Sequence, residues 1–290
     1  MCCDELVSST TNDPDRDPAT LRAVAEGLAA EAAAFVRRRR AEVFGPDARR
    51  GGGDAAVSTK STPTDPVTIV DTETERLLRE RLAELRPGEP IVGEEEGGSV
   101  DARSGRPTWV LDPIDGTVNF LYGIEAYAVS VGVQVEGASV AGAVANVPTG
   151  EVFSAAVGQG ARLQRGDTSI PLRCNAIRDL SMALVGTGFG YAPERRRGQA
   201  EVLTRLISDV RDVRRIGSCA LDLCMVAAGR LDAYYEGGVH VWDWAAGALV
   251  AAEAGARLRL PSGDDDEFIV AAAPGIADEF DAALRRVGAA

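Results

Sequence analysis

The sequence predicts a layered α/β protein and not a Rossmann-type fold. Runs of short strands alternate in blocks with amphipathic helices, which is typical of sheets covered by helices. The glycine-rich stretches contain no G-x-G-x-x-G between a strand and a helix, so dinucleotide binding is not indicated. With 290 residues, we expect a disordered tail at 1–17 and a single domain at 18–290, made of two packed halves that divide near 150–180.

The helices follow from apolar spacing and from the residues that begin and end them. Asp17 and Pro18 provide an N-cap and a first-turn proline for the first helix. Thr72 and Glu75 have the spacing of a capping box for the second, and Ser218 is expected to cap a later one. Helices are predicted at 18–44, 72–86, 117–122, 194–208, 218–228, 242–254 and from 276 onward.

Short apolar runs bounded by turn residues predict the strands. The segment 49–58 is glycine-rich and is predicted to be a mobile loop, and 60–71 reads as a turn followed by a strand. Glu136 and Gly137 favour a hairpin between two strands of an antiparallel sheet. Further strands are predicted at 91–92, 109–112, 128–135, 139–147, 151–157, 161–164, 183–186, 231–235, 257–260 and 268–272.

Composition limits the classes of function. The net charge of -13 argues against a nucleic-acid-binding surface. No run reaches the roughly 18 apolar residues of a membrane span, and the N-terminus lacks the basic and apolar regions of a secretory signal. The five cysteines are scattered without a C-x-x-C pair, which indicates neither a zinc site nor a disulfide framework. We therefore expect a soluble, cytoplasmic protein that acts on a small molecule.

One motif points to metal-dependent phosphate chemistry. An apolar run ends at Asp112, Pro113 is expected to stop the strand, and Asp115 follows three positions after the first acid. Side chains that leave a strand end and a tight turn can converge, so the two acids are expected to share a cation. The N–H groups of Gly116 and Thr117, at the start of the next helix, would face the same point and favour a phosphate. Carboxylate and phosphate oxygens are the ligands that Mg²⁺ prefers.

Two further acids are candidates for the same site. Glu94 follows a short strand, and Asp243 begins a helix. Each acid alone is more typical of a helix cap or a surface charge. As a set, however, acids at the ends of separate buried elements are how a multi-metal site is assembled. Lys60, the only lysine, lies in a loop and is a candidate balancing charge.

The chain closely resembles the inositol monophosphatase family. The resemblance rests on D-P-I-D-G-T at 112–117 and W-D-W-A-A-G at 242–247, which are highly specific in that order. It extends to G-E-E at 93–95, to the segment 60–71 and to Y-Y-E at 234–236, and it covers nearly everything after residue 20. It implies an αβαβα sandwich of the inositol monophosphatase and fructose-bisphosphatase type, Mg²⁺-dependent hydrolysis of a phosphate monoester, lithium inhibition and a homodimer.

The resemblance also implies roles for individual residues. Two or three Mg²⁺ ions would be held by Glu94, Asp112, the carbonyl of Ile114, Asp115 and Asp243. Asp71 and Thr117 would orient and deprotonate the attacking water, with Glu94 beside them. The substrate contacts would come from Glu94, Ile114, Asp115, Gly116, Thr117, Arg214, Gly217, Ala220, Glu236 and Asp243. Among these, Glu236 would accept hydrogen bonds from inositol hydroxyls, whereas the single histidine, His240, is expected only to pack.

Several readings remain open beside myo-inositol 1-phosphate. Relatives with the same metal core could act on histidinol phosphate, fructose 1,6-bisphosphate or phosphoadenosine phosphate. A non-catalytic, metal-holding regulatory module is a different class, and Asp71 and Thr117 argue against it because they serve turnover. A haloacid-dehalogenase-type phosphatase is excluded, because its D-x-D-G-T motif separates the acids by one residue and here two residues lie between Asp112 and Asp115.

Overall fold

The computed structural model describes residues 16–45, 57–60, 65–98, 105–262 and 267–289. Nearly all of the tail expected at 1–17, and most of the loop expected at 49–58, lie outside these ranges. The helices are α1 (Pro18–Phe44), α2 (Ile69–Leu85), α3 (Thr117–Tyr122), α4 (Pro193–Leu206), α5 (Cys219–Ala227), α6 (Val241–Glu253) and α7 (Ala277–Val287). The strands are β1 (Val57–Thr59), β2 (Pro66–Thr68), β3 (Ile91–Gly93), β4 (Thr108–Asp115), β5 (Ala128–Val135), β6 (Ala138–Asn146), β7 (Val152–Ala156), β8 (Ala161–Arg165), β9 (Thr168–Pro171), β10 (Leu184–Thr187), β11 (Asp212–Arg214), β12 (Ala233–Gly237), β13 (Arg257–Arg259) and β14 (Phe268–Ala272).

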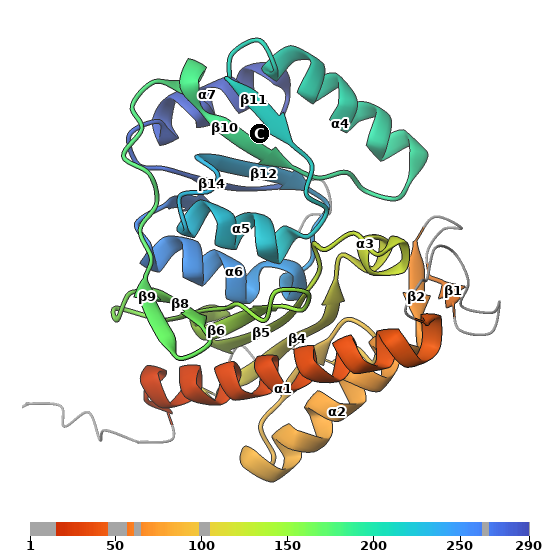
Figure 1. Ribbon diagram of the computed structural model, residues 1–290. Helices are drawn as coiled ribbons and strands as arrows, with labels where there is room; N and C mark the ends of the chain where they lie inside the picture. The colour runs from red at the N-terminus through yellow and green to blue at the C-terminus, as the bar shows by residue number, and fades with distance from the viewer. Residues whose placement is uncertain (1–15, 46–56, 61–64, 99–104, 263–266, 290) are drawn as a thin grey trace, which may run out of the picture.

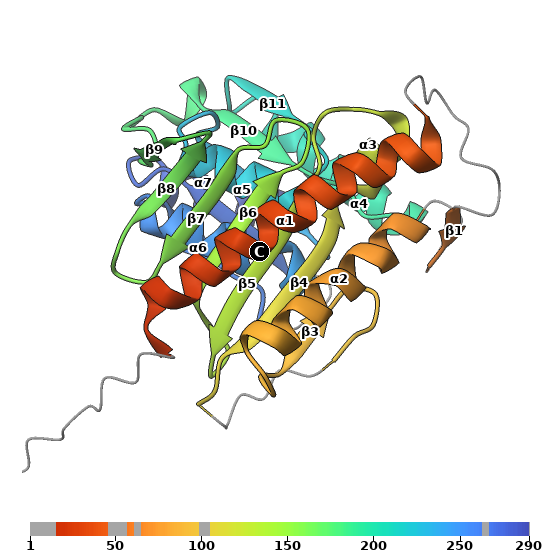
Figure 2. The same cartoon turned by 60° about the horizontal axis from the view of Figure 1, so that its bottom comes forward.

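These elements form alternating layers of helix and sheet (Figure 1). A seven-stranded sheet has the order β3-β4-β5-β6-β7-β8-β9, and a five-stranded sheet has the order β11-β10-β12-β14-β13. Helices α1 and α2 lie across the outer face of the larger sheet (Figure 2), α5 and α6 lie between the sheets, and α4 and α7 cover the smaller sheet. The predicted layered architecture is confirmed. The division of the domain near 150–180 stays a prediction.

The outer helix α1 shows how the sequence produces the layers. Leu21, Ala25, Leu28 and Ala32 are buried and recur at helical spacing, so they form one apolar stripe. This stripe packs on the larger sheet in a core that includes Val131. Alanines alternate with leucines along this stripe, so the helix presents a continuous apolar surface to the strands.

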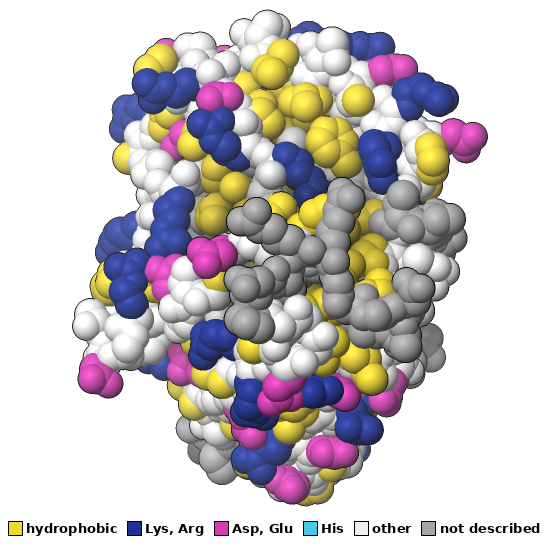
Figure 3. All heavy atoms as spheres, turned by 45° about the vertical axis from the view of Figure 1, so that its right-hand side comes forward, with side chains coloured by type: hydrophobic (Ala, Val, Ile, Leu, Met, Phe, Trp, Pro, Cys, Tyr) yellow, Lys and Arg dark blue, Asp and Glu magenta, His cyan; other side chains and the backbone are white. Residues whose placement is uncertain are grey.

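Charged and apolar side chains are mixed on the surface. Figure 3 shows one face on which acidic and basic side chains are interspersed among apolar ones. Within the ranges that the structure describes, no helix is both long and apolar enough to cross a membrane.

Helix α2 begins earlier than the sequence predicted. The expected strand up to Asp71 ends at Thr68, and the capping box consists of Thr68 and Asp71, not of Thr72 and Glu75. The Thr68 hydroxyl accepts from the Val70 N–H at 3.1 Å, and Asp71 Oδ2 accepts from the Thr68 N–H at 2.9 Å. The β-branched pair before Asp71 favours a strand locally, but the cap overrides this preference.

Strand β4 continues through Pro113, which was expected to stop it. Asp112 pairs with Ser130 and Asp115 with Ala128, so three steps along β4 match two steps along β5. One extra residue therefore lies in β4 as a β-bulge, where a proline without an N–H is tolerated. The short strands β1, β9 and β11 were also not predicted, because they carry no apolar alternation.

Two glycines in the larger sheet allow α6 to approach it closely. A Cβ added at Gly142 would lie 2.9 Å from Ala246 Cα, and one added at Gly132 would lie 2.9 Å from Ala245 Cβ. Real Cβ atoms are essentially never found at such distances from other atoms, so a side chain at either position would force the helix or the strand to shift. Helix α6, which carries Asp243 in its first turn, therefore packs directly against the backbone of the strands at these two glycines.

We expect Gly142→Ala to destabilise the protein by about 1–3 kcal/mol, the usual cost of overpacking a closely packed core. Denaturant unfolding measures this change. Gly198→Ala in α4 is the matched control, because an added Cβ there meets no atom within 4 Å and alanine favours the helix. Equal stability of the Gly142 variant and the wild type would contradict the close packing of α6.

Candidate active site

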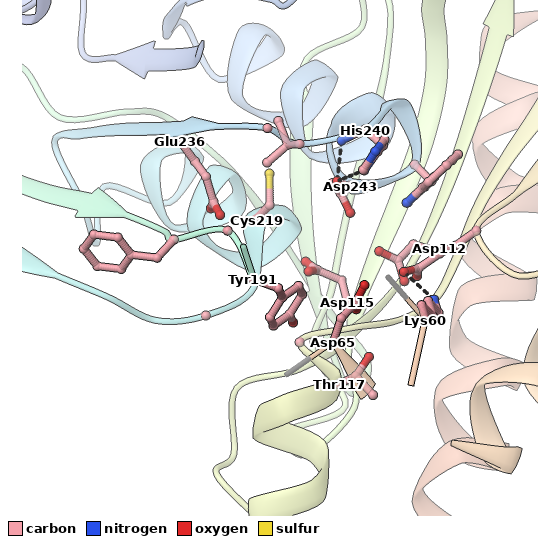
Figure 4. Close-up of a pocket in the computed structure, with 18 of the residues that line it drawn as sticks. Lys60, Asp65, Asp112, Asp115, Thr117, Tyr191, Cys219, Glu236, His240 and Asp243 are labelled. Atoms are coloured by element: carbon pink, nitrogen blue, oxygen red, sulfur yellow. Dashed lines mark hydrogen bonds and ion pairs between the residues drawn. The ribbon is translucent and has the colours of Figure 1, made fainter. Parts of the chain in front are cut away.

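A cavity of about 390 Å³ gathers most of the residues singled out from the sequence (Figure 4). Its walls come from the end of β4, the start of α6, the end of β12 and the loop before α5. The predicted site residues that line it are Lys60, Glu94, Asp112, Ile114, Asp115, Gly116, Thr117, Gly217, Glu236, His240 and Asp243. Both sheets therefore contribute to one cavity.

Three carboxylates converge in this cavity. Asp112, Asp115 and Asp243 each offer an oxygen that lies within 4.8 Å of the others. Asp115 Oδ2 accepts from the Ser218 hydroxyl at 2.5 Å and from the Ala220 N–H at 2.7 Å, which fixes this side chain. Asp112 Oδ1 is buried and has no hydrogen-bond partner within the described structure. A buried carboxylate oxygen without a donor is costly, so the arrangement calls for a cation.

The electrostatics of the acids agree with this conclusion. Burial, followed by the neighbouring carboxylate of Asp243, raises the pKa of Asp115 to about 8. Burial and the charges of Glu94, Asp115 and Asp243 raise the pKa of Asp112 well above its usual value. Without positive charge nearby, these acids favour the protonated form. A divalent cation would compensate the same negative charge.

Glu94 is held at the edge of the cavity by a turn that α2 supports. The buried carboxylate of Glu75 accepts from the N–H groups of Glu95 at 2.8 Å and Glu96 at 3.0 Å. Lys60 Nζ reaches Glu94 at 2.8 Å and Glu95 at 2.6 Å. Burial alone would lower the pKa of Lys60, but these carboxylates outweigh it and raise the pKa. The only lysine thus balances the acidic turn, as its position in the sequence suggested.

Thr117 links the cavity to Asp71. The Thr117 hydroxyl lies 3.2 Å from Asp71 Oδ1 and 3.0 Å from the carbonyl oxygen of Ile114. Asp71 is fully buried, and its other oxygen accepts from both the N–H and the hydroxyl of Thr68. Burial raises the pKa of Asp71 to about 6, despite these hydrogen bonds. A group that ionises near neutral pH and is hydrogen-bonded to a cavity hydroxyl is suited to accept a proton.

The loop before α5 is joined to α3 by backbone contacts. Gly116 has a φ of +95°, and a Cβ there would lie 3.0 Å from the carbonyl oxygens of Ala126 and Gly217. Asn119 Nδ2 donates to the carbonyl oxygens of Ala126 at 2.7 Å and Ile216 at 2.9 Å. Only glycine fits at position 116, because any side chain would separate the two walls of the cavity.

Some predicted substrate contacts lie elsewhere. Arg214 is exposed, pairs with Asp212 at 2.6 Å and does not line the cavity, whereas Arg215 does. The Ala220 N–H is directed to Asp115 and not to the cavity. Arginine repeats give no indication of which side chain points inward. Arg195, Tyr191 and Cys219, which also line the cavity, were not singled out from the sequence.

His240, which was expected only to pack, is exposed and lines the cavity. Its ring stacks on Trp242 with 4.8 Å between centroids. Its N–H donates to Asp243 Oδ2 at 2.5 Å, so the backbone at position 240 helps to orient this acid. The ring Nδ1 lies 3.7 Å from the same oxygen, so both the main chain and the side chain of His240 stand beside Asp243.

Comparison with known proteins places the chain in a family. The model of the inositol monophosphatase family matches residues 17–288. The inositol-1-monophosphatase SuhB of Mycobacterium tuberculosis is 66% identical over 279 residues, which cover 94% of this chain and 96% of that protein. The inositol-1-monophosphatase of Mycobacterium leprae is 64% identical over 280 residues, with 94% and 96% covered. The solved structure of Mycobacterium tuberculosis SuhB matches with a TM-score of 0.81 at 61% identity and covers 94% of this chain and 99% of that chain. The chain therefore belongs to the inositol monophosphatase family and is a phosphoric monoester hydrolase.

Proposed function

We propose that this phosphatase hydrolyses myo-inositol 1-phosphate in a reaction that depends on Mg²⁺. The observation that carries the proposal is the convergence of Asp112, Asp115 and Asp243, together with the buried Asp112 Oδ1 that lacks a donor within the described structure. Figure 4 shows Glu236 on the opposite side of the cavity from Asp112. The names of the mycobacterial relatives support inositol 1-phosphate as the substrate.

The residues fit Mg²⁺ because their donor atoms are hard oxygens without a thiolate or imidazole among them. One ion would be held by Glu94, Asp112 and the carbonyl of Ile114. A second would be held by Asp112, Asp115 and Asp243, and a third, weaker one would lie near Glu94. When bound, the cations would neutralise the phosphate charge and lower the pKa of water.

Thr117 and Asp71 would position and deprotonate the attacking water. The water would donate to the Thr117 hydroxyl, which in turn donates to Asp71 Oδ1 at 3.2 Å. The proton would pass to Asp71, which is buried and does not itself reach the cavity. The water oxygen forms a bond to phosphorus, the ester bond breaks, and the leaving alcohol takes up a proton.

Glu236 would recognise the alcohol part of the substrate. Burial raises its pKa to about 7, although the hydrogen bond donated by the Tyr234 hydroxyl opposes this rise. A carboxylate accepts hydrogen bonds from several hydroxyls, which suits a polyol. Lithium inhibition, a homodimer and activity on other small phosphate esters remain proposals that the family suggests.

Removal of metal is expected to abolish activity and to change the pH dependence of stability. In the metal-free protein the folded state binds more protons than the unfolded state between about pH 4 and the raised pKa of Asp115, about 8. Its stability therefore falls as pH rises through this window. Mg²⁺ compensates the ionised acids, so its stabilisation should be larger at about pH 8 than at about pH 5.5.

Thermal unfolding with EDTA and with excess Mg²⁺ at both pH values measures this difference, and a phosphate-release assay measures activity. Asp243→Asn should lose most of the Mg²⁺-dependent rise in Tm. Glu80→Gln, at an exposed position of α2, should keep it. Full activity in EDTA would overturn the metal assignment.

Thr117→Ala and Asp71→Asn are expected to lower kcat by roughly 10²-fold or more, the scale of positioned general-base catalysis. Asp71 must be ionised to accept a proton, so wild-type activity should fall as pH drops below about 6. In Asp71→Asn, the residual activity should no longer show this decline at low pH. The Mg²⁺-dependent rise in Tm should survive in the Thr117 variant. Thr204→Ala, an exposed threonine of α4, is the control. A wild-type rate for Thr117→Ala would rule out its role.

Glu236→Ala is expected to reduce kcat/KM for inositol 1-phosphate at least tenfold more than for glycerol 2-phosphate, since a charge-assisted hydrogen bond contributes roughly 1.5–3 kcal/mol and about 1.4 kcal/mol is a factor of ten. Both substrates are measured with both proteins. Equal losses would show that Glu236 supports the metal site or the fold, and the inositol assignment would then lack structural support.

A further inference from the structure

We propose that Tyr234 is a positioning residue that holds the carboxylate of Glu236 in place for the hydroxyls of a polyol, and that Gly188 leaves the space this carboxylate occupies. The inference rests on the proposed role of Glu236 in substrate recognition. Neither the metal site nor the attacking water explains how the Glu236 carboxylate would select a polyol.

The first observation is a hydrogen bond along one strand. Tyr234 and Glu236 are two positions apart in β12, so their side chains leave the same face. The Tyr234 hydroxyl donates to Glu236 Oε2 at 2.5 Å. Tyr234 is fully buried, whereas Glu236 reaches the cavity. The tyrosine therefore acts as a rigid support beneath the carboxylate.

The second observation is the space opposite the tyrosine. Gly188 follows β10, which pairs with β12 in parallel. A Cβ at Gly188 would lie 1.9 Å from Glu236 Oε2 and 2.0 Å from Glu236 Cδ. Even an alanine would occupy the place of the carboxylate. The group is thus confined between a donor on one side and bare backbone on the other.

The third observation explains why Tyr234 remains protonated. The Cys219 thiol lines the same cavity and is the titratable neighbour that, after burial, most affects the pKa of Tyr234. Burial is the largest cause that raises the pKa of both Tyr234 and Cys219 well above their usual values. Both groups therefore keep their protons near neutral pH, so the Tyr234 hydroxyl retains the proton that it donates to Glu236 Oε2.

A fixed acceptor matters more for a polyol than for a simple ester. Several ring hydroxyls must meet one carboxylate in a single orientation, and a mobile glutamate would lose rotamer freedom on binding. A small alcohol that does not reach Glu236 gains little affinity from the fixed position of this carboxylate. Loss of the tyrosine hydroxyl should therefore weaken discrimination between substrates and leave metal binding intact.

The neighbouring tyrosine provides a matched control. Tyr235 is also buried in β12, but it contacts Phe268 and Phe280 in the core of the smaller sheet, with ring centroids 6.3 and 6.1 Å apart. Within the described residues, its buried hydroxyl has no hydrogen-bond partner. Tyr235→Phe makes the same chemical change at an adjacent position on the other face of the strand.

The test is a double-mutant cycle with two substrates. Tyr234→Phe, Tyr235→Phe, Glu236→Ala and the double variant Tyr234→Phe/Glu236→Ala are assayed on inositol 1-phosphate and glycerol 2-phosphate. We expect Tyr234→Phe to raise KM for inositol 1-phosphate about five- to tenfold, within the range for an ordinary intramolecular hydrogen bond, with a smaller change in kcat. Tyr235→Phe should change neither constant. The substrate ratio is kcat/KM for inositol 1-phosphate divided by kcat/KM for glycerol 2-phosphate. In the Glu236→Ala background, Tyr234→Phe should have no further effect on this ratio.

The possible failures are distinguishable. If Glu236→Ala affects both substrates equally, the proposed function fails. If Glu236→Ala discriminates but Tyr234→Phe does not, or if the two losses multiply in the double variant, the positioning role is wrong. Gly188→Ala provides a second arm, since it should reduce the same substrate ratio with an unchanged Mg²⁺-dependent rise in Tm. An unchanged ratio in that variant would contradict the confinement of the carboxylate.

Discussion

The extra residue in β4 is the constraint on which the site depends. Side chains three positions apart on a regular strand point to opposite faces of the sheet. Between Asp112 and Asp115 the bulge adds one residue, so the two acids match partner positions that are two apart and face the same side. Pro113 is accepted there because no ladder hydrogen bond is required of it. The spacing of the D-P-I-D motif is therefore a consequence of strand geometry as much as of metal chemistry.

The layered fold assigns different parts of the reaction to different layers. The larger sheet and α2 provide Asp112, Asp115 and Asp71, and the turn after β3 provides Glu94. The smaller sheet provides Glu236, which faces the alcohol side of the cavity in our proposal. Asp243 comes from α6, which lies between the sheets. Alcohol recognition can therefore change through β12 and its neighbouring loop without changes in β4.

The sequence predicted most helices, the longer strands and the acids, because apolar periodicity and acid spacing are local signals. It did not predict the cap at Thr68, where β-branched residues before Asp71 favoured a strand. It could not show that Arg215 lines the cavity and Arg214 does not, because the direction of each arginine depends on packing across layers. The support of the acidic turn by Glu75 was also hidden, since its partners are backbone N–H groups about twenty residues away.

The contact between α6 and the larger sheet explains the second half of the W-D-W-A-A-G motif. Asp243 lines the cavity, whereas Ala245 and Ala246 lie against Gly132 and Gly142, where helix and strand meet closely. A methyl group added at Gly142 would meet an α-carbon, which every amino acid possesses. No exchange at position 246 can therefore compensate for it. Over evolutionary time, position 142 should remain glycine independently of position 246, and it should not drift together with it as ordinary core pairs do.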